Sequence, residues 1–377
     1  MSVKILCIAG ARPNFMKIAP LLRAFSSEPF FEPRLLHTGQ HYDDKLSRIF
    51  FEDLRIPRPD VELEVGSGSH AAQTAEIMRR FEPVLRDEQP HAVLVVGDVN
   101  STIACALVTA KFQLESPFAW KQGTRRRPVI IHVEAGLRSF DDDMPEEVNR
   151  KLTDAISDVL FVSDPAGIAH LRREGVPSDR VFFVGNVMID TLLSARDRAM
   201  QSQVLVELGL AGRAHGLVTL HRPSNVDDPS ALREILTTLD SLACELPLVF
   251  PIHPRTRGRL QGLGFTLDPH RWILTDPVGY LDFLKLMATA RVVLTDSGGV
   301  QEETTVLGVP CVTLRENTER PVTMEEGTNI LAGTQPSRIR EAFTQAMTAP
   351  RTGRVPQYWD GQAAVRVRDI LLGLFRS

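Results

Sequence analysis

Short apolar segments alternate with longer segments of helical periodicity along nearly the whole chain. The first half contains the apolar segments VKILCIAG, PRLLHTG, AVLVVGD, PVIIHVEAG, DVLFVS and VFFVGN. The second half contains GLVTLH, LPLVFPIH, RWILTD, RVVLTDSG, VPCVTLR and NILAG. Continuous apolar strands separated by amphipathic helices are typical of parallel sheets that helices cover on both faces. Because each half holds about six such strands, we predict an α/β chain with two doubly wound, Rossmann-like parallel-sheet domains.

The chain has 377 residues, which is the length of two ordinary domains. We predict an N-terminal domain over residues 1–185 and a C-terminal domain over residues 186–360. The junction is placed between Gly185 and Asp190, where GNVMIDTLL leaves one strand and starts a long helix. The last segment, residues 361–377, is amphipathic, and we expect it to form a helix that packs back on the N-terminal domain.

Composition argues against several functional classes. The net charge of −4 argues against a nucleic-acid-binding protein, which needs a basic surface, and we interpret the basic run KQGTRRRP, residues 121–128, as a solvated loop. The four cysteines are widely spaced in apolar sequence, so we expect reduced core residues and neither disulfides nor a metal site. No apolar run reaches about 18 residues, and the N-terminus enters a strand without a signal-peptide pattern, so we expect a cytoplasmic protein with no membrane partner.

Ligands of open parallel sheets bind beyond the carboxyl ends of the strands. In this chain those positions carry many charged and polar side chains. After the first strand, Gly10 allows a tight turn, while Arg12 and Lys17 place two cations at the start of a helix. Neither the dinucleotide pattern G-x-G-x-x-G nor the P-loop pattern explains this turn. It is either a surface turn with solvated charges or a cation clamp for an anionic leaving group.

Carboxylates follow two later strands of the first half. Asp98 comes just before a helix, so it is either a capping residue or a site residue. Glu134 ends the next strand, and neighbouring parallel strands end at the same edge of a sheet. We therefore expect Asp98 and Glu134 in one crevice, where two carboxylates can form an acid/base pair. In MPEEVNRK, Glu146 and Arg150 form either an ordinary ion pair on an exposed helix face or part of the site.

The second half offers groups that suit a bipolar ligand. The segment TDSGGVQEE places Ser297, Gly298 and Gly299 in a strand-to-helix turn, whose backbone N–H groups can bind an anion at the helix N-terminus. Its two glutamates would repel that anion but can accept hydrogen bonds from hydroxyl groups. A nucleoside diphosphate, with its ribose diol beside its phosphates, fits this turn. His221 and His253 end successive strands and are interpreted as donors to the diphosphate, because no cluster with metal-ligand spacing accompanies them.

These stretches together resemble the non-hydrolysing UDP-N-acetylglucosamine 2-epimerases, in order and in spacing, from Gly10 to Pro321. The matching stretches are GARPNFMKIAP, TGQHYD, GD with Asp98, HVEAGLRS, MPEEVNR, GN before the second domain, HR, SGGVQEE and TERP. The resemblance implies the two-domain fold of B-type glycosyltransferases, with the active site between the domains. It further implies a UDP-sugar substrate, no cofactor, a homodimer and a role in polysaccharide biosynthesis.

The family reaction inverts C2 of the sugar. A carboxylate removes the C2 proton as UDP leaves C1 in an anti elimination, and UDP re-adds to the bound 2-acetamidoglucal after a proton returns to the other face. The resemblance implies that the catalytic residues are Asp98, Glu134, Glu146 and His221. Acid/base groups on both faces of the sugar and a cationic clamp for departing UDP are what this chemistry needs.

The resemblance also implies that the C-terminal domain holds most of the UDP. The backbone of Ser297, Gly298 and Gly299 would bind the diphosphate together with His221, and Glu303 would accept hydrogen bonds from the ribose diol. The residues that would complete the polar site are Arg12, Lys17, Arg150, His253 and Arg320.

Several other functions stay open on the sequence. A relative that acts on a modified UDP-sugar, or a hydrolysing variant that releases free N-acetylmannosamine, would share the same residues. A glycosyltransferase of the same fold would need an acceptor site, and it needs fewer carboxylates than the three present here. A non-catalytic nucleotide-sugar sensor would be favoured by loss of the acid/base positions, all of which are present.

Overall fold

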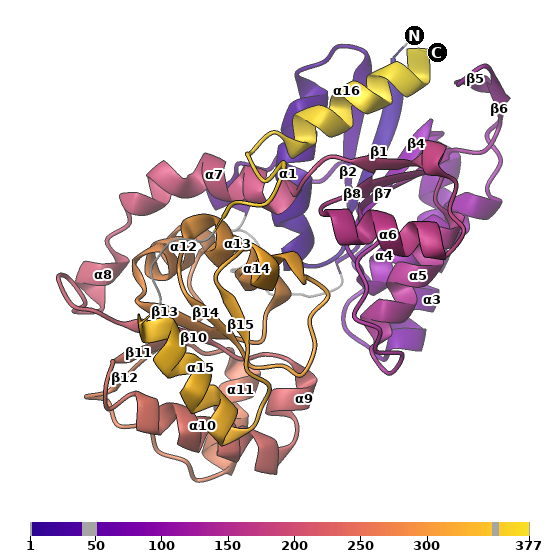
Figure 1. The fold of residues 1–377 in the computed structure, drawn as a ribbon. Coiled ribbons are helices and arrows are strands. Elements are labelled where there is room, and N and C mark those ends of the chain that lie inside the picture. Colours follow the sequence, from indigo (N-terminus) through magenta and orange to yellow (C-terminus); the bar gives the residue numbers. More distant parts are fainter. Residues whose placement is uncertain (1, 40–50, 349–353, 377) are drawn as a thin grey trace. The chain divides into compact units, whose positions relative to one another are not determined.

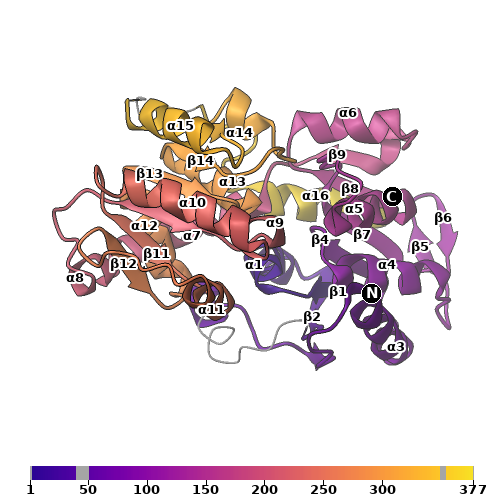
Figure 2. The same ribbon diagram turned by 90° about the horizontal axis from the view of Figure 1, so that it is seen from below.

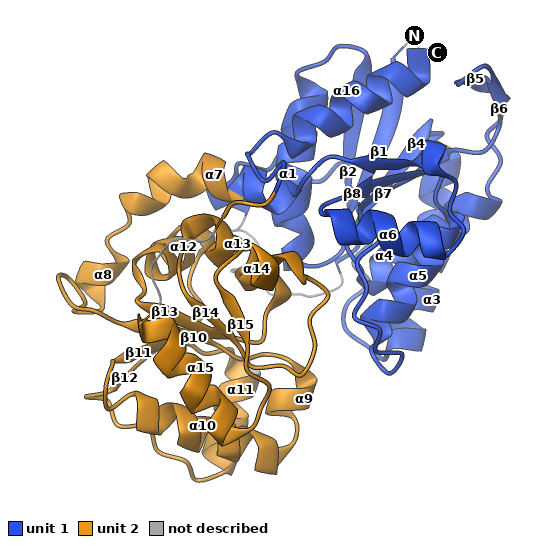
Figure 3. Ribbon diagram, viewed as in Figure 1, with its two compact units in different colours: residues 1–191, 357–377 blue, residues 192–356 orange. Residues whose placement is uncertain are grey.

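The chain was analysed as a computed structural model, which describes residues 2–39, 51–348 and 354–376. It divides into two compact units (Figure 3). Unit 1 comprises Met1–Thr191 and Gln357–Ser377, and unit 2 comprises Leu192–Pro356. The division at Thr191 lies inside helix α7, Val187–Met200. The first turn of α7 belongs to unit 1, because Asp190 accepts hydrogen bonds from the backbone of Ala363 and Ala364 in that unit.

Unit 1 is built on a seven-stranded sheet in the order β3-β2-β1-β4-β7-β8-β9, with every neighbouring pair parallel (Figure 1). Strands β4 and β7 lie at its centre and are buried along their whole length. The strands are β1 Val3–Ala9, β2 Phe31–His37, β3 Val61–Glu62, β4 Ala92–Val96, β7 Val129–Ala135, β8 Val159–Val162 and β9 Val181–Phe183. The largely apolar sequences of the longer strands are the reason that the pattern could be recognised in the sequence.

Helices cover both faces of this sheet. Helices α3, α4 and α5 pack side by side, and α16 packs against α1. The helices of unit 1 are α1 Arg12–Ser26, α3 His70–Glu88, α4 Asn100–Lys111, α5 Pro145–Ile156, α6 Pro165–Arg173, the short 3-10 turn Ser178–Arg180 and α16 Ala363–Arg376. The C-terminal helix α16 therefore lies in the same unit as the N-terminus, and the ring of Phe375 lies 4.6 Å from that of Trp120.

Unit 2 repeats the topology with a six-stranded parallel sheet in the order β12-β11-β10-β13-β14-β15. Its strands are β10 Gly216–Thr219, β11 Leu248–Pro251, β12 Trp272–Thr275, β13 Val292–Thr295, β14 Cys311–Thr313 and β15 Asn329–Leu331. Its helices are α8 Val204–Glu207, α9 Pro223–Val226, α10 Pro229–Leu242, α11 Pro254–Gly262, α12 Tyr280–Thr289, α13 Gly298–Leu307, α14 Val322–Glu325 and α15 Pro336–Thr348. Helices α10 and α15 pack together over one face of this sheet (Figure 2).

The prediction of two doubly wound parallel sheets is confirmed. In each unit the chain steps outward along one side of the sheet and then returns to the other side of its first strand. The order therefore reverses between β1 and β4 in unit 1 and between β10 and β13 in unit 2. Such switch points open a crevice at the carboxyl ends of the strands, and these are the ends that carry the predicted site residues.

Three local predictions were wrong or incomplete. The two-residue strand β3 was missed because it is too short for a periodic signal. The run at residues 121–128 is not all loop, since Gly123–Arg125 forms strand β6, which pairs in antiparallel fashion with β5, Phe118–Trp120. Of the four cysteines, Cys7, Cys105 and Cys311 are buried as expected, whereas Cys244 is exposed. Within the described ranges, no helix is both long and apolar enough to cross a bilayer.

Candidate functional site

Glu134 and Lys17 form a buried ion pair in unit 1. Lys17 Nζ on α1 pairs with Glu134 Oε2 at the end of β7, and both residues are at most 5% exposed. The backbone of Glu134 has a left-handed φ of 76°, and the pairing of β7 with β8 is irregular between Val133 and Ala135. A non-glycine residue in this conformation costs about 1–3 kcal/mol and persists where the surroundings hold it, often at functional sites. The bulge aims the Glu134 carboxylate at Lys17.

Gly97 makes room for this pair. It follows β4, has a φ of 65° and lies so close that an added Cβ would come within 2.9 Å of Lys17 Nζ and 3.2 Å of Glu134 Oε2. Glycine adopts such backbone angles without steric cost. The turn between β4 and α4 can therefore approach the Glu134 carboxylate closely. Asp98 follows Gly97 in this turn.

Asp98 is held by residues of α5. Its Oδ2 accepts a hydrogen bond of 2.5 Å from Nη1 of Arg150, and its carbonyl accepts one of 2.9 Å from Nδ2 of Asn149. The capping residue of α4 is Val99, so the alternative of Asp98 as a helix cap is not what the structure has. The Asp98 side chain is 24% exposed. Asp98 is therefore the more accessible of the two predicted acid/base carboxylates.

Arg150 lies in the interior, not on an exposed helix face. Its side chain is 1% exposed and also pairs at 2.7 Å with Glu147 Oε2, which is fully buried. Burial alone would raise the pKa of Glu147, but hydrogen bonds from the Ser139 backbone and from Arg150 outweigh it, so the pKa is lowered. The alternative of an ordinary surface ion pair is therefore wrong. Glu146 lies half-buried in the first turn of α5.

The turn after β13 in unit 2 starts helix α13 at Gly298, as predicted for an anion-binding turn. Ser297 occupies the capping position, and no side chain of the described residues caps the first backbone N–H groups. Arg320 lies over this helix start, because a Cβ added at Gly298 would collide with its guanidinium. Its charge is balanced by Glu302 and Glu319, each at 2.8 Å.

Asp296 fixes His221 beside the same turn. The fully buried Asp296 carboxylate accepts hydrogen bonds from His221 Nδ1 at 2.8 Å and from the backbone N–H of His221 and Arg222. Burial would raise the pKa of Asp296, but the attraction of His221 and these hydrogen bonds outweigh it and lower the pKa. The His221 ring is 58% exposed, so its Nε2 can meet a ligand. His253 follows β11 and is also exposed.

Glu303 lies one turn further along α13 and is deeply buried. It accepts a hydrogen bond of 2.9 Å from the phenol of Tyr280, and both residues are 2% exposed. Burial raises the pKa of Glu303 to about 8; the Tyr280 hydrogen bond opposes this, and the neighbouring Glu302 adds to it. A carboxyl group in this state is mostly protonated at neutral pH, and this was not foreseen from the sequence.

The predicted residues thus fall into two groups within the units. Unit 1 brings together Lys17, Asp98, Glu134 and Arg150, and unit 2 brings together His221, Ser297, Gly298, Gly299 and Arg320. Arg12 starts α1, but its side chain lies outside the described part of the chain, as do residues 40–43 of the TGQHYD stretch. Sequence reasoning missed the partners Glu147, Asp296, Glu319 and Tyr280.

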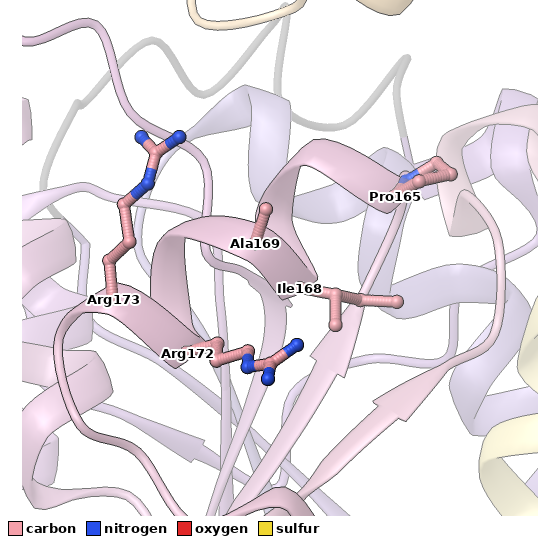
Figure 4. Close-up of a pocket in the computed structure, with 5 residues that line it drawn as sticks. All are labelled: Pro165, Ile168, Ala169, Arg172 and Arg173. Carbon is pink, nitrogen blue, oxygen red and sulfur yellow. The ribbon is translucent and has the colours of Figure 1, made fainter.

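A shallow pocket lies on α6 and contains none of these residues (Figure 4). It is lined by Pro165, Ile168, Ala169, Arg172 and Arg173. Within residues 2–39, 51–348 and 354–376, no group of three or more His, Cys, Asp or Glu side chains could hold a metal ion.

Comparisons with known proteins identify relatives of the whole chain. The family model described as UDP-N-acetylglucosamine 2-epimerase matches residues 23–372. A UDP-N-acetylglucosamine 2-epimerase of Methanococcus maripaludis is 38% identical, with 98% of both chains covered. A UDP-2,3-diacetamido-2,3-dideoxy-D-glucuronate 2-epimerase of Pseudomonas aeruginosa is 39% identical, with 99% of this chain and 100% of the other covered.

Solved structures show the same likeness. The UDP-GlcNAc 2-epimerase of Methanocaldococcus jannaschii, in complex with UDP-GlcNAc and UDP, has a TM-score of 0.89 at 37% identity and covers 98% of this chain and 100% of its own. A UDP-glucosyltransferase of Polygonum tinctorium shares the fold alone, with a TM-score of 0.60 at 13% identity over 100% of this chain and 99% of its own. The expected likeness to B-type glycosyltransferases is thereby confirmed, and the chain belongs to the UDP-N-acetylglucosamine 2-epimerase family.

Proposed function

We propose that the protein interconverts UDP-N-acetylglucosamine and UDP-N-acetylmannosamine by anti elimination of UDP and its re-addition to 2-acetamidoglucal. The observation that carries this proposal is the pair of carboxylates after β4 and β7, each with its own cation. Asp98 is paired with Arg150, and Glu134 is paired with Lys17. Removing a proton from one face of C2 and returning one to the other requires two such groups.

The cations have a role in this chemistry. Lys17 and Arg150 each place a positive charge against one of the two carboxylates. Arg150 is also held by Glu147, so it stays in place when Asp98 takes up a proton. Glu146, in the first turn of the helix that carries Arg150, is the third carboxylate of the proposed catalytic set.

Unit 2 would hold the UDP. The backbone N–H groups at Gly298 and Gly299, at the start of α13, would direct the positive end of this helix at the diphosphate. His221, fixed by Asp296, would donate Nε2–H to a phosphate oxygen and so stabilise departing UDP. Glu303 would accept hydrogen bonds from the ribose diol, and Arg12, His253 and Arg320 would complete the polar contacts.

A modified UDP-sugar is the second candidate substrate. The relative named for UDP-2,3-diacetamido-2,3-dideoxy-D-glucuronate is 39% identical to this chain, and the relative named for UDP-N-acetylglucosamine is 38% identical. These nearly equal identities do not separate the two substrates, and both reactions invert a C2 that carries an acetamido group. Both sugars would use the same acid/base pair.

The test is proton NMR of the purified protein with UDP-N-acetylglucosamine in deuterated water. Formation of UDP-N-acetylmannosamine, with deuterium at C2 of both epimers, is the expected result. Free N-acetylmannosamine with UDP would support the hydrolysing alternative instead. No change, together with turnover of the diacetamido glucuronate substrate, would replace the first candidate with the second.

Two further expectations extend this proposal. The family resemblance favours a homodimer, which sedimentation equilibrium of the purified chain would test. A cytoplasmic location, where a nucleotide sugar for polysaccharide biosynthesis would be made, could be tested by cell fractionation.

A further inference from the structure

His132 is a fully buried histidine in the middle of strand β7, where Glu134 is the other polar residue, and the proposed chemistry does not use His132. A polar side chain in such a strand has to find partners in the interior, because burying it without hydrogen bonds is costly. His132 has a partner for each ring nitrogen. These partners connect it to the two backbone segments that carry Asp98 and Glu134.

Both partners of His132 accept hydrogen bonds. Nδ1 lies 2.7 Å from Oδ1 of Asp154 on α5, and Nε2 lies 2.9 Å from the carbonyl oxygen of Gly97. A carboxylate and a carbonyl both need a donor, so each ring nitrogen carries a proton in this arrangement. The resulting imidazolium is balanced by the Asp154 carboxylate.

Asp154 also binds the chain on the C-terminal side of Glu134. Its Oδ2 accepts from the backbone N–H of Gly136 at 3.0 Å and from Nη2 of Arg138 at 2.7 Å. Burial would raise the pKa of Asp154, but the charges and hydrogen bonds of His132 and then Arg138 outweigh it and lower the pKa. The carboxylate thus binds the chain two residues before Glu134, through His132, and two residues after it, at Gly136.

The bracketed backbone is strained. Glu134 and Gly136 both have left-handed φ angles, of 76° and 81°, and Glu134 lies at the irregularity of the strand pairing between Val133 and Ala135. Such a conformation persists only when its surroundings over-determine it. Asp154 supplies hydrogen bonds on both sides of the strained residue, from a helix that also carries Arg150 and Asn149, the partners of Asp98.

We propose that His132 and Asp154 are a pair of positioning residues that fix the separation of the Asp98 and Glu134 carboxylates. The pair ties the carbonyl just before Asp98 to the backbone on both sides of Glu134. This inference rests on the proposed function of those two carboxylates as the acid/base groups. A shift of about 1 Å in either carboxylate is enough to cost on the order of 10²-fold in rate.

The test compares Asp154→Asn, His132→Gln and the double variant, assayed with UDP-N-acetylglucosamine in deuterated water. We expect kcat to fall by about 10²-fold in each single variant, with KM and the Kd of UDP little changed, because His132 and Asp154 are not among the proposed UDP contacts, most of which lie in unit 2. We expect the double variant to lose no more than either single variant, since residues that act as a unit are not additive. His215→Gln is the matched control, because His215 is also buried and bonds the Leu286 carbonyl at 3.0 Å in unit 2; its kcat should stay unchanged.

Three results would overturn the inference: an unchanged kcat in either single variant, an equal loss in the His215 control, or losses that add in the double variant. Nitrogen NMR of the wild-type protein with labelled histidine gives a readout that needs neither activity nor a folded variant. The two hydrogen bonds require a donor on each ring nitrogen of His132, and a signal from a nitrogen without a bonded proton would refute the arrangement. If the wild-type protein exchanges no C2 proton, the proposed function fails, while this NMR result still decides whether the doubly donating pair exists.

Discussion

Unit 1 and unit 2 place their candidate site residues at corresponding points of two sheets with the same winding, but with different chemistry. At the carboxyl ends of β4 and β7, Asp98 and Glu134 are paired with buried cations. Beyond β13, the main feature is the backbone of Gly298 and Gly299 at the start of α13. The first arrangement can exchange protons, whereas the second offers fixed dipoles to an anion.

The same contrast applies to the buried charges. In unit 1 the buried cations Lys17 and Arg150 serve the carboxylates. In unit 2 the buried carboxylates instead hold positively charged or hydrogen-bonding side chains in place. Glu319 pairs with Arg320, and Asp296 fixes His221. One fold thus supports two functions, because the loops after the strands decide the chemistry and the sheet decides only where it is placed. Variants in the two units should therefore separate turnover from UDP binding.

The largest expected effect is on turnover, from Asp98→Asn in unit 1. Loss of a general acid or base typically lowers the rate by about 10²–10⁴-fold, and the Kd of UDP should change little. Arg150 keeps its second partner Glu147, so the folded state should be retained. Single-turnover kinetics and calorimetric titration with UDP measure the two quantities. Asp142→Asn is the control, because Asp142 is an exposed carboxylate paired with Lys151 outside the site; a large loss of UDP affinity in Asp98→Asn would erase the contrast between the units.

The next effect is on UDP binding, from Glu303→Ala in unit 2. A hydrogen bond to a charged group contributes about 1.5–3 kcal/mol, so the Kd of UDP should rise by roughly ten- to more than a hundredfold. Because the pKa of free Glu303 is raised to about 8, a carboxylate that accepts from ribose must release a proton on binding. UDP affinity of the wild-type protein should therefore increase from pH 6 to pH 8.

Tyr280→Phe provides the matched control for this variant. It removes the phenol that donates to Glu303 but leaves the carboxyl group in place. At neutral pH, UDP should bind to it more weakly than to the wild-type protein but more tightly than to Glu303→Ala, because the carboxyl group remains but has lost the hydrogen bond that lowers its pKa. An unchanged Kd in Glu303→Ala would remove Glu303 from the ribose site.

A smaller effect on UDP binding is expected from Gly298→Ala. The new methyl group would collide with the Arg320 guanidinium, which is held in ion pairs with Glu302 and Glu319. Either Arg320 moves or the first turn of α13 shifts, and both displace groups proposed to face the diphosphate. We expect a roughly tenfold rise in the Kd of UDP, comparable to one lost hydrogen bond. Gly258→Ala is the control, because a Cβ at Gly258 meets nothing within 4 Å.

The positions of the site residues could largely be predicted from the sequence, but their partners could not. Parallel strands end at a common edge, so apolar segments followed by Asp98, Glu134 or His221 were enough to place these residues there. The burial of Glu303 against Tyr280 depends on the packing of α12 on α13, which no local pattern encodes. The left-handed backbone of Glu134 likewise depends on tertiary contacts.

The role of Glu147 as the buried partner of Arg150 could have been predicted from the sequence. Glu147, Arg150 and Asp154 are spaced by three and four residues, so they share one face of α5. The exposed apolar residues Val148 and Leu152 lie on another face, and they made the exposed and buried sides hard to tell apart by hydrophobicity. Considering charged residues at helical spacing as a possible buried network would have favoured Glu147 over Glu146 as the partner of Arg150.

The smallest effect concerns how the stability of the two units depends on pH. Burial raises the pKa of Asp190 in unit 1 to about 6, against hydrogen bonds from Ala364 and Ala363, and it raises the pKa of Glu303 in unit 2 to about 8. Each unfolded carboxyl group ionises near its ordinary pKa, 3.8 for Asp and 4.5 for Glu. At pH values between the unfolded and the folded pKa, the folded state binds more protons than the unfolded state. The free energy of unfolding therefore decreases as the pH rises through this range.

The loss of stability caused by ionisation of Asp190 is largely complete above about pH 6. From pH 6.5 to pH 8, the further loss of stability comes from ionisation of Glu303. Glu303→Gln should remove this part of the slope, which is at most about 1.4 kcal/mol per pH unit for one proton. Asp190→Asn should change the slope only below about pH 6. Urea unfolding at half-unit pH steps, followed by tryptophan fluorescence, measures both. Equal slopes for wild-type and Glu303→Gln protein above pH 6.5 would mean that Glu303 is already ionised in the folded chain, so that UDP binding would release no proton from it.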